Sequence, residues 1–139
     1  MTRQGNRRKV DAAFSAGRLR SARDFHRAAR AWMESAQEGE NAAPAMSHIV
    51  SAAIAYGDAV SARFGGVVNS QDHAGAALLL RDVLREGFPE EQATRLRRML
   101  GEKDSAQYGP RPVSLIAARQ RMQDLDRFAT WAEDLLADG

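Results

Sequence analysis

A stretch rich in small residues, residues 42–65, constrains the fold more than any other part of the chain. Ala, Gly and Ser dominate it, and its apolar residues recur at steps of three and four, which places them along one side of an α-helix. Pro44 falls in the first turn, where proline costs no hydrogen bond. We therefore expect a central bundle helix over about residues 44–64. Its inner side holds Met46, Ile49, Val50, Ala53, Gly57, Val60 and Phe64.

Four further segments have helical spacing of apolar residues. We expect a helix from near Ser21, one capped by Ser70 or Asp72, one from Glu90 through Ala106, and one over about residues 113–137. No segment alternates strongly enough to predict a strand. The sequence therefore predicts an all-α, up-and-down bundle of four or five helices with short loops.

The charge of the chain is unevenly distributed. The formal net charge is +2, yet the first 30 residues hold nine Arg or Lys against two Asp. Residues 1–17 mix glycine and charge without a period, so we expect a flexible basic arm there and a single domain over residues 18–139. Such an arm either contacts RNA, DNA or an acidic protein, or is a solvated tail.

Several classes of function are disfavoured by composition. The chain has no cysteine, which excludes disulfides and thiolate metal sites. Its three histidines do not stand in a metal-binding spacing, so we expect no metal and no cofactor. No apolar run approaches the roughly 18 residues that span a bilayer, and we expect a cytoplasmic protein without membrane contact.

Polar residues in two places exceed what helix packing needs. Asp72 and His73 precede one predicted helix, and Lys103 and Tyr108 lie at the end of the next. Asp72 is explained as a helix cap, and Lys103 as an ion-pair partner of Asp72 or Asp58. The other interpretation is a polar recess that holds a phosphate or nucleotide.

The order of these motifs resembles the prokaryotic HEPN domains over about residues 42–135. The motifs are Ala-Tyr-Gly-Asp-Ala-Val in the central helix, a glycine connector, Gln-Asp-His before Leu-Leu-Leu, and Lys-x-x-x-x-Tyr-Gly before the last helix. The resemblance implies a helical bundle that commonly dimerises. Non-catalytic relatives bind nucleotides or partner proteins, often nucleotidyltransferases, and some belong to toxin–antitoxin pairs.

The catalytic branch of that family cleaves RNA without a metal, using Arg-x4–6-His near the last long helix. Here Arg111 has no histidine within reach, whereas Arg20 and His26 match the spacing but lie near the start of the first predicted helix. We therefore expect a non-catalytic, dimeric module that binds a nucleotide, RNA or a protein. The alternative is a metal-independent ribonuclease that uses Arg20 and His26, or an atypical pair such as His73 and Lys103.

Overall fold

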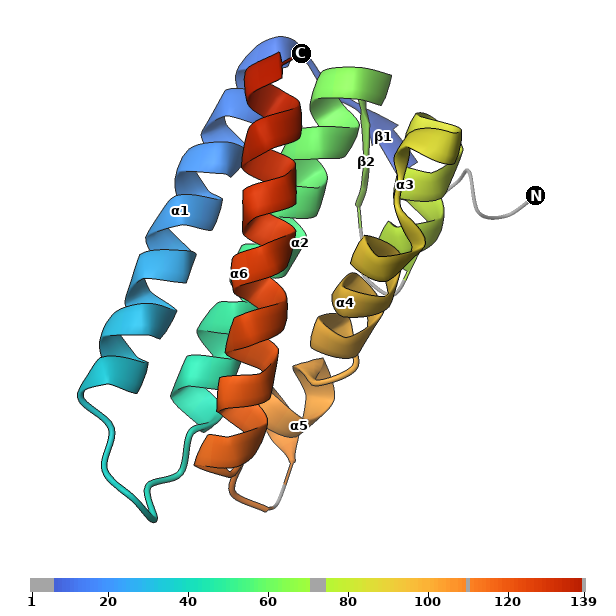
Figure 1. The fold of residues 1–139 in the computed structure, drawn as a ribbon. Coiled ribbons are helices and arrows are strands. Elements are labelled where there is room, and N and C mark those ends of the chain that lie inside the picture. Colours follow the sequence, from blue (N-terminus) through green and yellow to red (C-terminus); the bar gives the residue numbers. More distant parts are fainter. Residues whose placement is uncertain (1–6, 71–74, 110, 139) are drawn as a thin grey trace.

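Three long helices set the shape of the molecule. The computed structural model describes residues 7–70, 75–109 and 111–138. The helices α1 (Ala12–Glu34), α2 (Ala43–Gly65) and α6 (Leu115–Asp138) lie side by side lengthwise (Figure 1). Since α1 and α2 are joined by a short loop, they run in opposite directions.

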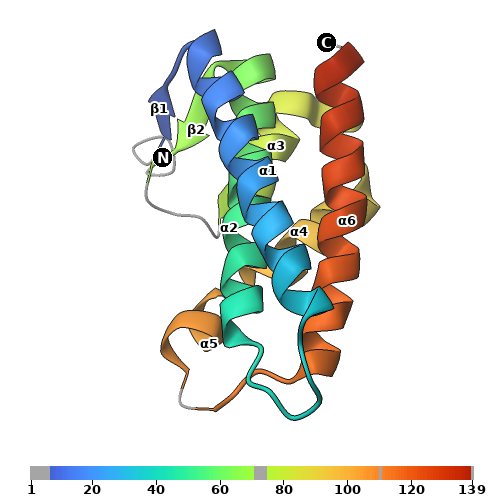
Figure 2. The same ribbon diagram turned by 90° about the vertical axis from the view of Figure 1, so that its left-hand side faces the viewer.

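Shorter elements complete the bundle. On the other flank of α2 lie α3 (Ala76–Leu84), a 3-10 turn at Arg85–Gly87, and α4 (Glu90–Leu100). The helix α5 (Lys103–Tyr108) lies at the end of the bundle that also holds the α1–α2 loop (Figure 2). The opposite end carries a two-stranded antiparallel sheet of β1 (Arg7–Lys9) and β2 (Val67–Asn69).

The helix α2 occupies the centre, as its small residues predict. It is contacted by α1, α3, α4, α5 and α6, and most of its side chains are buried. Pro44 lies in its first turn, and Gly66 ends it with a left-handed backbone at φ 63°. A residue with a Cβ is strained in that conformation, which explains the glycine.

The predicted fold class, an all-α up-and-down bundle, is confirmed, and the described residues add a small sheet that the sequence does not predict. Apolar residues from all the long helices form one core, including Met46, Ile49, Leu96, Leu125 and Phe128.

No helix in the described part of the chain is long and apolar enough to cross a membrane.

The prediction that the first helix starts near Ser21 is wrong. The helix begins at Ala12, nine residues before Ser21, because Asp11 caps it and accepts a hydrogen bond from the backbone N–H of Phe14. Residues 7–9 pair with β2. The arm expected over residues 1–17 therefore carries regular structure from Arg7 onward, and residues 1–6 lie outside the described part.

The helix expected from Glu90 through Ala106 is also corrected. It is two helices, α4 and α5, separated by a turn at Gly101 and Glu102. Glycine is a poor helix former, and at Gly101 the chain leaves the helix with its N–H still bonded to the carbonyl of Arg97.

Candidate functional site

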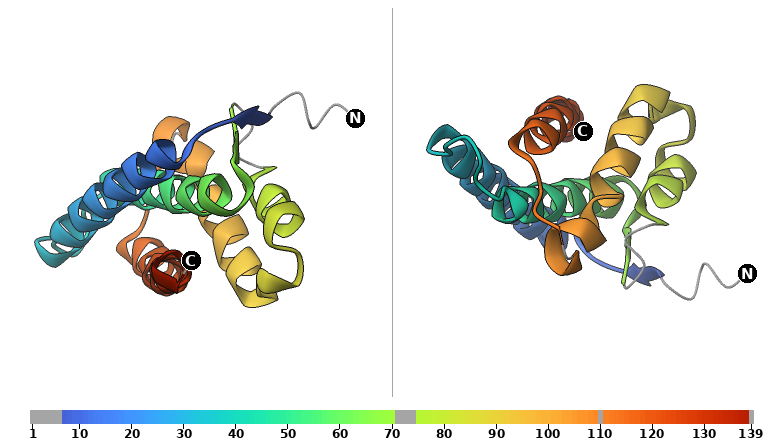
Figure 3. Two further views of the ribbon diagram at one scale, coloured as in Figure 1. Left: turned by 90° about the horizontal axis from the view of Figure 1, so that it is seen from above. Right: turned by 90° about the horizontal axis from the view of Figure 1, so that it is seen from below.

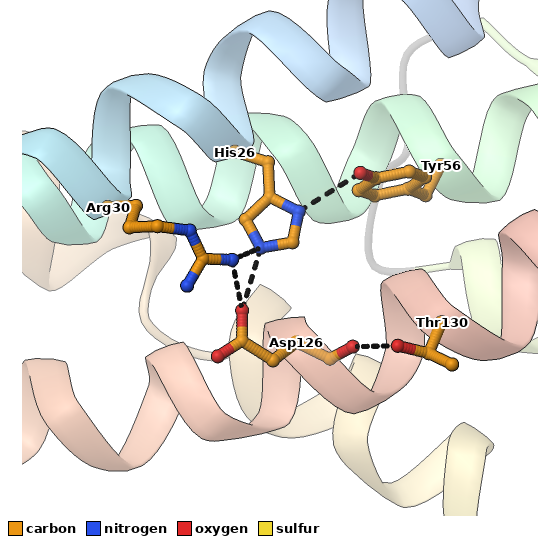
Figure 4. A network of polar contacts seen from close by, with 5 residues as sticks. All are labelled: His26, Arg30, Tyr56, Asp126 and Thr130. Carbon is orange, nitrogen blue, oxygen red and sulfur yellow. Dashed lines mark hydrogen bonds and ion pairs between the residues drawn. The ribbon is translucent and has the colours of Figure 1, made fainter.

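Three helices bring polar side chains together around His26. In Figure 4 the imidazole of His26, on α1, lies between Tyr56 of α2 and Asp126 of α6. The Nδ1 atom is 3.0 Å from the Tyr56 hydroxyl, and Nε2 is 2.8 Å from Oδ1 of Asp126. Arg30, one turn further along α1, donates to the same Asp126 oxygen over 3.0 Å. We call His26, Arg30, Tyr56 and Asp126 the α1–α6 network.

For a neutral imidazole, the groups in this network favour one tautomer of His26 over the other. Burial raises the pKa of Tyr56 to about 12, so its hydroxyl keeps its proton and can donate to Nδ1. A hydrogen on Nε2 then donates to the Asp126 carboxylate, which can only accept. The opposite tautomer would place a nitrogen lone pair against that carboxylate. Arg30, whose Nη2 lies 3.1 Å from Nε2, then shares the acceptor of His26.

A second pair joins the same two helices. Arg23 donates two hydrogen bonds to Glu133, from Nε to Oε2 at 2.8 Å and from Nη2 to Oε1 at 2.6 Å. These bonds lower the pKa of Glu133. Arg23, His26 and Arg30 share a face of α1 because they are three and four residues apart. Two of the five arginines of α1 are therefore paired with carboxylates of α6.

Next to this network is an open hollow of about 570 Å³. Not all polar groups in its wall are used by the protein. Arg30 donates to Asp126 through one Nη atom. Asp134 is exposed and forms no ion pair with a described residue. Thr130 donates to the Asp126 carbonyl. We call this open space the α1–α6 hollow. It is lined by His26, Arg30, Tyr56, Asp126, Ala129, Thr130, Glu133 and Asp134.

The pair predicted from spacing, Arg20 and His26, is not part of one site. Six residues on a helix separate two side chains by about 120° around the axis and about 9 Å along it. Arg20 is exposed. His26 instead meets Arg30 on its own face and Tyr56 and Asp126 from other helices.

The predicted cluster of Asp72, His73, Lys103 and Tyr108 stays a prediction. Asp72 and His73 lie outside the described residues, as does the side chain of Tyr108. Lys103 is half-buried at the start of α5. Its alternative partner Asp58 is paired with Arg18.

The sequence contains a signal for the observed site, but a search for a single short motif misses it. Arg23, His26 and Arg30 follow the helical repeat on one segment, and Asp126 and Glu133 follow it on another. Opposite charges with matching repeats indicate two helices that pair. The spacing carries no sign that Tyr56 would join them, because its contact depends on how α1 and α2 pack.

The described residues contain no group of three or more His, Asp or Glu side chains arranged to hold a metal ion.

No protein-family model matches the chain, and a search of curated proteins finds no match.

Proposed function

We propose that this chain is a non-catalytic HEPN-like bundle that binds a nucleoside or a nucleoside monophosphate in the α1–α6 hollow. The hollow has a volume within the roughly 300–1,000 Å³ that small-molecule sites occupy. Its wall offers both donors and acceptors. The residues that would contact the ligand are Arg30, Asp126 and Asp134.

The observation that carries this proposal is that both ring nitrogens of His26 are held by the protein. Tyr56 occupies Nδ1 and Asp126 occupies Nε2. A general base needs a free nitrogen within reach of the proton that it removes. The imidazole is better suited to hold three helices together than to move protons, which favours binding over catalysis.

The charge of the hollow favours ligands with many donors and little negative charge. Its wall carries one arginine and three carboxylates, of which Glu133 is already neutralised by Arg23. The hydroxyls of a ribose or the amino group of a base can donate to Asp126 and Asp134. Arg30 can accommodate a single phosphate, whereas a triphosphate would be repelled by the carboxylates.

A thermal-shift panel tests this proposal. Adenosine, guanosine, their monophosphates and ATP are added to the full chain, and a selective ligand at 100 times its Kd stabilises the folded state by about 2.7 kcal/mol. We expect at least one nucleoside or monophosphate to raise Tm and ATP to have the smallest effect. Failure of every member to raise Tm would exclude the proposed ligand class.

Matched variants locate the ligand. Arg30→Gln and Asp134→Asn should abolish the shift, because both groups line the hollow. Arg27→Gln serves as the control, since Arg27 is an exposed residue of the same helix that pairs with Asp24. Equal loss in the control would show that the shift does not arise from the hollow.

The HEPN resemblance also leads us to propose a cytoplasmic homodimer that acts beside a protein partner. The partner class is a nucleotidyltransferase or the other component of a toxin–antitoxin pair. Light scattering over a range of concentrations tests the dimer, and a strict monomer at the highest concentration would contradict it.

A second candidate function, a metal-independent ribonuclease, is favoured by the charge around His26. An arginine and a carboxylate contact the same imidazole nitrogen at the wall of an open hollow. Binding of RNA would have to displace Tyr56 or Asp126 to free a ring nitrogen. Labelled RNA incubated in EDTA distinguishes the candidates: turnover that His26→Ala abolishes would establish the ribonuclease, and no turnover would leave binding as the function.

A further inference from the structure

The sheet end of the bundle presents cations that the α1–α6 network does not use. In β1, Arg8 and Lys9 are exposed, and they pair in register with Val68 and Val67 of β2. Arg63 is exposed in the last turn of α2, four residues before Val67. The strand therefore holds two exposed cations at the end of the bundle where α2, with Arg63, also ends.

Among the described residues, the acidic side chains nearby are already engaged, which leaves positive charge in excess. Arg8, Lys9 and Arg63 form no ion pair with any residue in the described ranges. The charge of Arg8 does act on the carboxylate of Asp58 at longer range. The nearby acids have these roles: Asp11 caps α1, Asp58 pairs with Arg18, and Asp82 pairs with Arg7 over 2.9 Å.

Two of these cations, Arg8 and Arg63, each lie over an aromatic ring. The guanidinium carbon of Arg8 stands 5.1 Å from the centre of the Phe14 ring, in the first turn of α1. Arg63 stands in the same way over Phe64, at 5.4 Å. Beside Arg8 is an open hollow of about 370 Å³, lined by Arg8, Lys9, Val10, Asp11 and Phe14.

We infer that this end of the molecule binds single-stranded nucleic acid. We call the surface formed by Arg8, Lys9 and Phe14, which line one hollow, the β1 surface. Its cations, which form no ion pair with a described residue, attract backbone phosphates, and planar guanidinium and aromatic groups offer faces on which unstacked bases can lie. A duplex keeps its bases stacked on one another, so it can use only the charges.

The position of β1 separates this surface from the acidic side of the bundle. Seen from above, β1 lies on the side of α2 away from α6 (Figure 3). The carboxylates of α6 pair with α1 and line the α1–α6 hollow. A polyanion can therefore approach the β1 surface without meeting them, and the inference does not depend on nucleotide binding in the hollow.

Fluorescence anisotropy with labelled oligonucleotides of about 12 nucleotides tests the inference. The probes are single-stranded RNA, single-stranded DNA of the same sequence, and the DNA duplex, all at low salt. We expect both single strands to bind within about threefold of each other and at least tenfold more tightly than the duplex. Absence of binding to either single strand, or a duplex bound equally well, would overturn it.

Variants with matched charge distinguish binding at the β1 surface from general electrostatic attraction to the protein. The double variant Arg8→Gln, Lys9→Gln should weaken binding at least tenfold and lower the slope of log K against log salt by about 0.7 for each phosphate that is no longer neutralised. The control Arg27→Gln, Arg119→Gln removes the same charge from two exposed residues elsewhere and should change binding less than twofold. Equal weakening by both would overturn the inference.

The aromatic contribution needs its own measurement. Phe14→Leu should weaken single-strand binding about fivefold or more without changing the salt slope, because it removes a stacking face and no charge. Circular dichroism melting confirms that each variant is folded. Arg30→Gln should leave oligonucleotide binding unchanged, so failure of nucleotide binding in the hollow and failure of this inference give different results.

Discussion

Arg18 of α1 donates from Nε to Oδ2 of Asp58 on α2 over 3.1 Å, at a place where only 16% of the aspartate side chain is exposed. Burial raises the pKa of Asp58 to about 6, although Arg18 and, at longer range, Arg8 both favour the charged form. The cost of removing the carboxylate from water therefore exceeds the attraction of its partner.

This relationship predicts how stability depends on pH. The folded chain holds the Asp58 proton more tightly than the unfolded chain does, so the contribution of this group to the free energy of unfolding falls as pH rises from about 4 to about 6. Asp58→Asn removes that titration. Urea unfolding across this range should show the wild type losing on the order of 1–3 kcal/mol relative to Asp58→Asn.

The control for this prediction is Asp24→Asn. Asp24 is largely exposed and pairs on the surface with Arg27. The wild type should show no such loss relative to Asp24→Asn. If the difference between wild type and Asp58→Asn stayed constant from about pH 4 to about pH 6, burial would not be governing this carboxyl group.

Gly65 is predicted to tolerate no side chain. A Cβ built on it lies 2.7 Å and 3.0 Å from the two Cγ atoms of Val83 on α3. These atoms are close to the backbone and cannot swing away. Gly65→Ala should therefore destabilise the fold by about 1–3 kcal/mol in urea unfolding, and Val83→Ala in the same chain should recover part of the loss.

Gly17 offers the matched substitution. It lies within α1, and a Cβ there meets nothing closer than the flexible end of Arg20 at 3.8 Å. Gly17→Ala should stabilise the protein by about 0.5–1 kcal/mol, because alanine is the better helix former. Opposite signs at the two glycines are the expected result, and a stabilised Gly65→Ala would mean that α2 and α3 are not in close contact there.

How far the fold can be predicted depends on where the signal lies in the chain. The helices α2 and α6 follow from spacing alone, because each buries a stripe that repeats every three to four residues. The sheet cannot be found that way. Its strands are three residues long and almost 60 residues apart, and the pairing of Lys9 with Val67 has no local signature.

The candidate site is predictable only in part for the same reason. His26 is identifiable as a chemically useful residue, but spacing pairs it with Arg20, on a different part of the helix surface. Its actual partners Tyr56 and Asp126 are 30 and 100 residues away. Contacts between residues so far apart in the sequence arise from helix packing, which no motif of a few residues encodes.

The network around His26 should contribute measurably to stability. Tyr56→Phe keeps the buried ring but leaves Nδ1 of His26 without its donor, which should cost about 1–2 kcal/mol. A double-mutant cycle with His26→Ala should give a coupling of about 0.5–1.5 kcal/mol. Thr130→Val, which removes an exposed hydroxyl bonded to the Asp126 carbonyl, should change stability by less than about 0.5 kcal/mol. A coupling near zero would mean that the Tyr56–His26 contact does not stabilise the bundle.

The register of α6 is tested by two large aliphatic residues of that helix that face in different directions. Leu125 is fully buried in the common core, whereas Ile116 is 65% exposed. Leu125→Ala should cost about 2–5 kcal/mol, because it removes buried methyl groups and leaves a cavity. Ile116→Ala should cost less than about 0.5 kcal/mol. Because both substitutions replace a large aliphatic residue of the same helix by the same alanine, urea midpoints that shifted equally would mean that α6 does not pack through the face that holds Leu125.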